Sequence, residues 1–192
     1  MKKQKFLAMS VIILGMTASC NNAQPAKETN STQAAVTNPR FVIAPEEYSQ
    51  LSEKAFGHFA GFDYDAWGEM LADDVVYAFP DGDVDSRTKL EGKKAVLDWW
   101  KNWQKTSGVQ SMSLSEFNHF PLDVTAQPKG GAAKGTYDFV YFSNKMVFNG
   151  KPVSLRMNMA THFNADKKID RYYTYYDRSL IIKAMGRDIL EK

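Results

Sequence analysis

Residues 133–164, AKGTYDFVYFSNKMVFNGKPVSLRMNMATHFN, contain the pattern that decides the fold. Tyr, Phe, Val and Met are enriched here and alternate with polar residues, which is typical of β-strands with one buried face. The dipeptide Asn149-Gly150 lies in the middle, and Asn-Gly between two such runs is a strong signal for a tight hairpin turn. The stretch therefore predicts two long antiparallel strands, near 133–148 and 152–164.

The segments on either side extend this sheet and add helices. Period-two patterns predict strands near 110–125 and 168–177, and a shorter strand over 75–79. Apolar residues spaced three and four apart predict four helices. The first runs from Pro45 to Gly61, and the second is a short helix that Asp63 caps. The third and fourth cover 93–105 and 179–190. This order indicates an α+β fold: a curved antiparallel sheet packs on three N-terminal helices, with one further helix at the C-terminus. A sheet bent around helices leaves a cone, whose open end is a natural pocket.

Several short blocks of sequence, in their order and spacing, resemble a SnoaL-like member of the NTF2-like superfamily. The blocks are Trp67 with Leu71-Ala72-Asp73-Asp74-Val75-Val76, then Pro80-Asp81-Gly82, then Glu91-Gly92-Lys93-Lys94-Ala95-Val96 with Trp99 and Trp103, then Lys168-Ile169 ahead of Asp177. The resemblance covers roughly residues 46–190 and implies an NTF2-like cone. The fold hosts isomerases, dehydratases, cyclases, hydrolases and many proteins without catalytic activity, so function has to be argued from the site.

The resemblance places other residues at two positions where catalytic relatives carry an acid. In ketosteroid isomerase-like members, a general-base Asp directly precedes the Pro that ends the first strand, and here Phe79 holds that position. In polyketide cyclase-like and epoxide hydrolase-like members, an Asp lies three residues before the Asp that ends the last strand. Counting back from Asp177 gives Thr174. Catalysis by these routes is therefore not expected.

Aromatic residues are concentrated in the region from 41 to 192, which holds 24 of the 25 in the chain. Such a load predicts either a very aromatic core or an aromatic-lined cavity. We expect the cavity to bind a small, largely apolar molecule without converting it. The residues expected to line it are Trp67, Tyr77, Phe79, Trp99, Trp103, Tyr141 and Tyr175.

Three polar residues are the candidates for catalysis. Arg156 and His162 share one face of their strand. If that face points inward, His162 could act as a general base and Arg156 could bind an anion; otherwise both are solvated or lie at an interface. Asp177, at the junction of the last strand and the final helix, either caps that helix or presents a carboxylate at the mouth of the cone. An isomerase, dehydratase or hydrolase using His162 or Asp177 is therefore the alternative to a binding protein.

Metal and cofactor sites are not expected. The three His residues are scattered, and no paired-ligand spacing occurs. Asp81, Asp83 and Asp85 alternate like the start of a calcium loop, but Ser86 and Gly92 stand where the turn Gly and the bidentate Glu belong. The sequence has no Gly-x-Ser-x-Gly motif and no glycine-rich phosphate loop.

The first twenty residues predict export and lipid attachment. Three lysines and an apolar stretch precede Thr17-Ala18-Ser19, as in a secretory signal peptide over 1–19. Cys20, the only cysteine, follows at once, which resembles a bacterial lipoprotein signal and implies acylation of its thiol; an ordinary cleaved signal peptide is the alternative. Residues 20–40 then form a flexible tether to a single domain over 41–192. Because no Asp follows Cys20 directly, the resemblance implies the outer membrane of the cell envelope.

Net charge gives no reason to expect nucleic acid as a partner. Without residues 1–19 the chain has 21 basic and 22 acidic residues, so it is nearly neutral. The expected partners are a small apolar molecule and the membrane, through the lipid anchor. The resemblance also implies that the outer face of the sheet can form a homodimer or dock another protein, in which case side chains would fill the cone.

Overall fold

The computed structural model describes residues 39–81, 88–188 and 190. Signal peptide, Cys20 and most of the expected tether therefore lie outside the described residues. The elements in chain order are β1 (Phe41–Ile43), α1 (Glu47–Ala60), α2 (Tyr64–Met70), β2 (Leu71–Ala78), β3 (Lys89–Glu91), α3 (Lys93–Ser107), β4 (Val109–Val124), β5 (Gly135–Phe148), β6 (Lys151–Phe163), β7 (Ile169–Tyr176) and α4 (Ser179–Met185). None of the described helices is long and apolar enough to cross a membrane.

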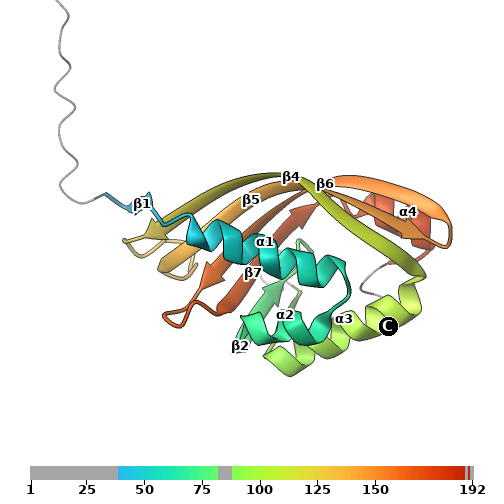
Figure 1. Cartoon of the computed structure of the whole chain (residues 1–192), viewed down its shortest axis with the longest axis horizontal. Helices are drawn as coiled ribbons and strands as arrows, with labels where there is room; N and C mark the ends of the chain where they lie inside the picture. Colours follow the sequence, from blue (N-terminus) through green and yellow to red (C-terminus); the bar gives the residue numbers. More distant parts are fainter. Residues whose placement is uncertain (1–38, 82–87, 189, 191–192) are drawn as a thin grey trace, which may run out of the picture. The chain divides into compact units, whose positions relative to one another are not determined.

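One curved sheet joins all of the described strands in the order β1-β4-β5-β6-β7-β2-β3. Figure 1 shows β4, β5 and β6 arching over α1, with α2 and α3 below and α4 near one end. The α+β cone with helices on the concave side is thus confirmed. One pair differs from the expected antiparallel sheet, because β2 lies parallel to β7. The chain passes through β4, β5 and β6 before β7 returns to lie beside β2.

The hairpin between β5 and β6 has the register that its turn predicts. Asn149 and Gly150 adopt φ values of 48° and 78°, and two positive values in a row are the signature of a type I′ turn. Pairing runs without interruption from Phe148 opposite Lys151 to Thr136 opposite Phe163. Alternate residues of β5 therefore face the helices along the whole strand.

Local capping explains where the helices begin and end. The Asp63 side chain accepts a hydrogen bond from the Ala66 amide at 3.1 Å and starts α2, as expected. Gly108, in the left-handed region at φ 77°, ends α3. Gly186 at φ 78° ends α4 in the same way, which is why this helix stops at Met185 instead of continuing to residue 190 as expected.

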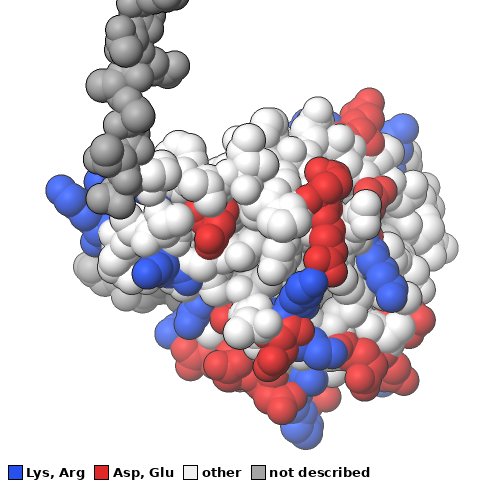
Figure 2. All heavy atoms as spheres, turned by 60° about the vertical axis from the view of Figure 1, so that its left-hand side comes forward, with Lys and Arg blue, Asp and Glu red and all other residues white. Residues whose placement is uncertain are grey.

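The two faces of the sheet differ in burial. The concave face carries Val140, Phe142 and Phe148, all at most 2% exposed, and packs against the buried side of α1, which includes Ala55 and Phe56. The opposite face carries partly exposed aromatic residues. In Figure 2 the charged side chains gather in the lower part of the view, whereas the upper part is mostly uncharged.

Candidate functional site

A cavity lies between the helices and the concave face of the sheet. Residues from α1, α2, α3, α4 and every strand from β4 to β7, together with Tyr77 of β2, form its wall. They are Phe56, Phe59, Trp67, Tyr77, Trp100, Trp103, Met112, Leu114, Phe142, Asn144, Met146, Met157, Met159, Tyr172, Tyr176 and Ile181. No Asp, Glu, His, Lys or Arg is among them.

Aromatic rings fill most of the cone. Trp100 makes edge-on contacts with Phe59, Tyr77 and Trp103, at centroid distances of 4.8, 5.4 and 5.2 Å. The remaining cavity measures about 40 Å³, room for about three water molecules. The sequence predicts that the rings surround a hollow. In the structure the rings pack against one another, and the space left is much smaller than a drug-sized ligand needs.

Methionines form the most adaptable part of the wall. Residues 41–192 contain six methionines, and four of them, Met112, Met146, Met157 and Met159, line the cavity. Met112 and Met146 are direct cross-strand partners on β4 and β5. A thioether side chain has three rotatable bonds and adopts new rotamers at low cost, so this side of the cavity can enlarge.

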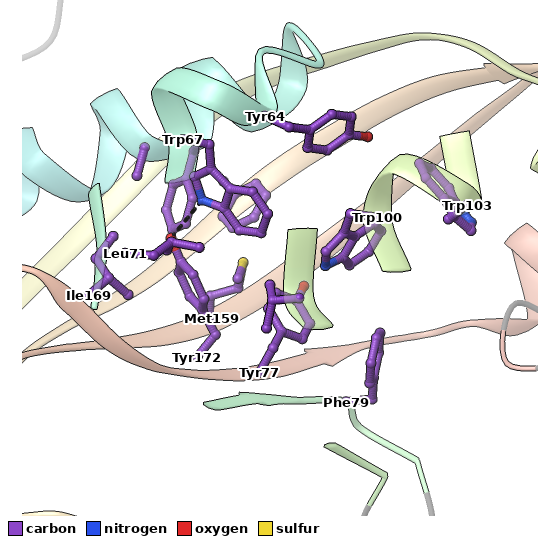
Figure 3. Close-up of a cluster of buried hydrophobic side chains, with 14 of the residues drawn as sticks. Tyr64, Trp67, Leu71, Tyr77, Phe79, Trp100, Trp103, Met159, Ile169 and Tyr172 are labelled. Carbon is purple, nitrogen blue, oxygen red and sulfur yellow. Dashed lines mark hydrogen bonds between the residues drawn. The ribbon is translucent and has the colours of Figure 1, made fainter. Parts of the chain in front are cut away.

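Polar atoms in the wall are few, and three of them have no partner. The Trp67 indole Nε1–H donates to the Tyr172 hydroxyl at 3.2 Å, a bond drawn in Figure 3. The Trp100 and Trp103 indole nitrogens and the Asn144 side-chain oxygen are buried without a hydrogen-bond partner. The other amide atom of Asn144 donates only to the Met157 sulfur, at 3.4 Å, which is a weak acceptor.

The titratable groups in the wall are tyrosines that stay neutral. Burial raises the pKa of Tyr77, of Tyr172 and of Tyr176 well above the usual value for a phenol. Among the described residues, the wall contains no carboxyl or imidazole that could act as a general base near neutral pH.

The aromatic residues predicted for the wall fall into three groups. Trp67, Tyr77 and Trp103 line the cavity as expected. Phe79 and Trp99 are not part of the wall. Their rings are tilted relative to each other at a centroid distance of 4.9 Å, and both contact the Trp100 ring.

Tyr141 and Tyr175 correct the prediction. They are 50% and 51% exposed on the opposite face of the sheet. The reason is strand alternation: Val140 and Phe142 point inward on β5, so Tyr141 between them points outward.

His162 holds a loop in place on the outer face of the sheet. Its Nδ1 bonds to the Asp170 carboxylate, and its Nε2 contacts the Lys134 carbonyl at 3.2 Å. Gly135, at φ 128°, makes room for the ring, since a Cβ there would lie 2.8 Å from Nε2. His162 is 5% exposed and both ring nitrogens are engaged, so it does not serve the cavity as a base.

Arg156 and Asp177 also lie outside the wall of the cavity. Arg156 donates to Glu116 at 3.2 Å and to the Ser143 hydroxyl at 3.0 Å on the exposed face. Asp177 is exposed and accepts from the amide of Ser179, the first residue of α4, at 2.9 Å; it lies one residue before the N-cap position, which Arg178 holds. The hydrogen bonds from Ser179 hold the pKa of Asp177 below its usual range.

A buried His–Asp pair lies under α1, and the sequence did not predict it. His119 Nδ1 contacts Asp138 at 2.8 Å, and Asp138 is completely buried. His119 Nε2 has no hydrogen-bond partner and lies 3.8 Å from the Glu53 carboxylate. The Phe117 ring stacks on His119 and also contacts Phe142, so one aromatic ring lies between His119 and Phe142 of the cavity wall. His119 and Asp138 lie on neighbouring strands joined by a ten-residue loop, whose register the sequence does not fix.

The aspartates of the supposed calcium loop do not form a metal site within the described residues. Asp81 pairs with Arg178 at 2.9 Å, while Asp83 and Asp85 lie outside the described residues. Burial raises the pKa of Asp81, and Arg178 partly offsets this. Among the residues that the structure describes, no group of three or more His, Cys, Asp or Glu side chains could hold a metal ion.

A cone-shaped α+β domain with a filled, apolar interior is the class that these observations define. The model of the SnoaL-like domain matches residues 53–172, and the chain belongs to this family. No curated protein matches the chain.

Solved structures share the fold at low sequence identity. A proposed isomerase from Bacillus subtilis is 19% identical with a TM-score of 0.58, and the match covers 76% of this chain and 97% of that one. A proposed polyketide cyclase from Xanthomonas campestris is 16% identical with a TM-score of 0.55, covering 73% and 97%. A protein with a ketosteroid isomerase-like fold from Catenulispora acidiphila, in complex with trimethylamine, is 12% identical with a TM-score of 0.53, covering 74% and 97%. At these identities the likeness shows the fold alone.

Proposed function

We propose that the cone binds a small, uncharged, mostly apolar molecule without converting it. The observation that carries this proposal is the wall of the cavity, which has aromatic and thioether side chains and no charged residue. A charged ligand would lose its hydration there without gaining an opposite charge. With no carboxyl or imidazole in the wall, the cavity has no group to move a proton to or from a bound molecule.

The four methionines of the wall would make room for the ligand. A cavity of about 40 Å³ is too small for a molecule the size of benzene. Rotamer changes of Met112, Met146, Met157 and Met159 enlarge it without moving the aromatic rings.

The positions of the methionines supply a direct test. Indole or p-xylene is titrated into protein labelled at the methionine methyl groups, and the NMR signals are followed. The signals of the four wall methionines should shift, while Met70 of α2 should not, because it lies outside the wall. If no methyl signal moves, or if Met70 moves as much as the others, the cone does not bind such molecules.

A second candidate function is catalysis at the pair of His119 and Asp138. The favouring observation is a fully buried carboxylate that orients His119 through Nδ1 and leaves Nε2 without a hydrogen-bond partner. This arrangement is typical of a general base. A ligand that is released chemically changed would support catalysis, and His119→Asn should then stop conversion while binding remains.

We also propose that Cys20 anchors the protein to the envelope membrane and that residues 20–40 act as a tether. The support is the sequence around Cys20 alone. Cells fed an alkyne-labelled palmitate should incorporate the label into the protein but not into a Cys20→Ser variant. Labelling of both proteins, or of neither, contradicts the anchor.

The outer face of the sheet is a proposed homodimer surface, because Phe120, Tyr141 and Tyr175 are each about half exposed there. Sedimentation should give the mass of a dimer for the wild type and of a monomer for Tyr141→Arg. A monomeric wild-type protein would contradict the proposal.

A further inference from the structure

We infer that the ligand carries one uncharged hydrogen-bonding group, a carbonyl, which accepts from the Trp100 and Trp103 indoles and lies against Asn144. This inference rests on the proposed binding function and adds the ligand's chemical class. The three side chains are called the polar anchor below.

The polar anchor consists of buried groups with unmet hydrogen-bonding capacity. Trp100 is 5% exposed, and Trp103 and Asn144 are each 4% exposed. Both indole nitrogens and the Asn144 oxygen are without a partner. Buried polar atoms in proteins nearly always have one, so three in a single cavity wall require an explanation.

Trp67, in the same wall, is an example of an indole whose N–H has a hydrogen-bond acceptor within the protein. Its Nε1–H donates to Tyr172, a bond between α2 and β7. In Figure 3, Trp100 and Trp103 lie next to each other on α3, away from this bond. The difference between Trp67 and the other two indoles is therefore a local property of the α3 side of the cavity.

The polar anchor belongs to two walls of the cavity. Trp100 and Trp103 are three residues apart and share one face of α3, whereas Asn144 belongs to β5. Trp103 also contacts Phe148 of β5 edge-on, with ring centroids 6.0 Å apart. A ligand between α3 and β5 could thus reach an indole on one side and the amide on the other.

The chemistry of these groups defines the ligand class. An indole N–H can only donate, so the ligand must supply an acceptor. The Asn144 amide can donate or accept according to which way it is turned, and it therefore tolerates a carbonyl or a neighbouring hydroxyl. Because the wall holds no charge, the acceptor must be neutral, which favours a ketone, ester or amide on an apolar skeleton over a carboxylate.

Two probes of nearly equal shape separate the polar anchor from apolar binding in general. Acetophenone has a carbonyl where α-methylstyrene has a methylidene group. Calorimetry with the wild-type protein should show acetophenone binding at least about tenfold tighter, which is about 1.4 kcal/mol. The indole N–H signals of Trp100 and Trp103 should move with acetophenone only, and that of Trp67 should stay in place.

Variants then assign the effect to the polar anchor. Asn144→Leu and Trp103→Phe should each reduce the preference for acetophenone, and the Asn144→Leu/Trp103→Phe double variant should reduce it further, because only the Trp100 indole then remains of the polar anchor. The matched control is Trp99→Phe on the same helix, which should keep the preference because Trp99 is not in the wall. If Asn144→Leu does not fold, Trp103→Phe and the indole signals still decide.

Each possible result has a defined meaning. Equal binding of the two probes to the wild type overturns the inference of a polar anchor but not the proposed apolar binding function. This result is also the one expected if these groups bind only water. Binding of neither probe, with no shift of the methionine signals, overturns both. A preference for acetophenone that is as large in the double variant as in the wild type also overturns the anchor, because the carbonyl must then bind elsewhere.

Discussion

The buried pair of His119 and Asp138 leads to the sharpest prediction about stability. Replacing His119 by Leu keeps an apolar side chain against Phe117 but removes the only hydrogen-bond partner found for the Asp138 carboxylate, at 2.8 Å. Asp138 is 0% exposed, so the variant holds an uncompensated buried charge. Breaking such a pair costs about 3–5 kcal/mol, a large share of the roughly 5–15 kcal/mol by which domains are stable.

The second half of this prediction is a partial rescue. The double variant His119→Leu/Asp138→Val removes the charge as well, so it should be more stable than His119→Leu by at least about 2 kcal/mol, although it carries more substitutions. The valine suits a strand and has no group that needs a partner.

Urea denaturation at pH 7, followed by tryptophan fluorescence, measures both effects. His58→Leu is the matched control: His58 lies 3.7 Å from the exposed Asp63, and losing such a surface pair should cost less than about 1 kcal/mol. The reasoning is refuted if His119→Leu costs no more than this control, or if the double variant is less stable than His119→Leu.

Three further predictions concern other contacts. Tyr172→Phe should cost about 1–3 kcal/mol in urea denaturation, because the buried Trp67 N–H loses its acceptor; an unchanged midpoint would show that the bond is not needed. Gly108→Ala should cost at least about 1–2 kcal/mol of stability because the residue has a φ of 77°. The new Cβ would in addition lie 2.4 Å from the Asn149 side chain. Gly130→Ala is the control and should be nearly neutral, because open space surrounds that position. Arg178→Met should raise the pKa of Asp81 further, because burial already raises it and Arg178 opposes that rise. A carboxyl whose pKa is raised in the folded state stabilises the protein at low pH, and this contribution is lost as the pH rises above the ordinary value of 3.8. The variant should therefore lose more stability over that range than the wild type. Carboxyl NMR titration and denaturation across the range measure both effects, and a lower pKa or a smaller loss of stability in the variant would contradict the reasoning.

Local signals in the sequence were sufficient for most of the fold. Asn149-Gly150 fixed the hairpin, Asp63 the start of α2 and Gly108 the end of α3, because each acts through its own backbone or side chain. The apolar spacing alone predicts a C-terminal helix that is too long, because Gly186 in the left-handed conformation ends it at Met185.

The interior was harder to predict, because it depends on which face of each strand points inward. Neighbouring residues of a strand face opposite sides of the sheet, so an assignment that is wrong by one residue exchanges the two faces. For this reason Tyr141 and Tyr175 are predicted in the cavity but lie on the outer face. The pair of His119 and Asp138 depends on the register between β4 and β5, which a ten-residue loop leaves open. The size of the cavity depends on how closely rings such as Trp100 pack, and composition does not determine that.

The parallel pairing of β2 with β7 has a consequence for how the chain acquires its structure. Tyr77 lies opposite Tyr172, so nearly a hundred residues must be made before β2 meets its central neighbour. Contacts so distant in sequence slow folding, since a long loop must close before they form. Until β7 is made, β2 and the helices α1, α2 and α3 would expose apolar surface that the sheet later covers. A chain truncated before residue 169 should therefore be degraded by proteases instead of reaching the native state.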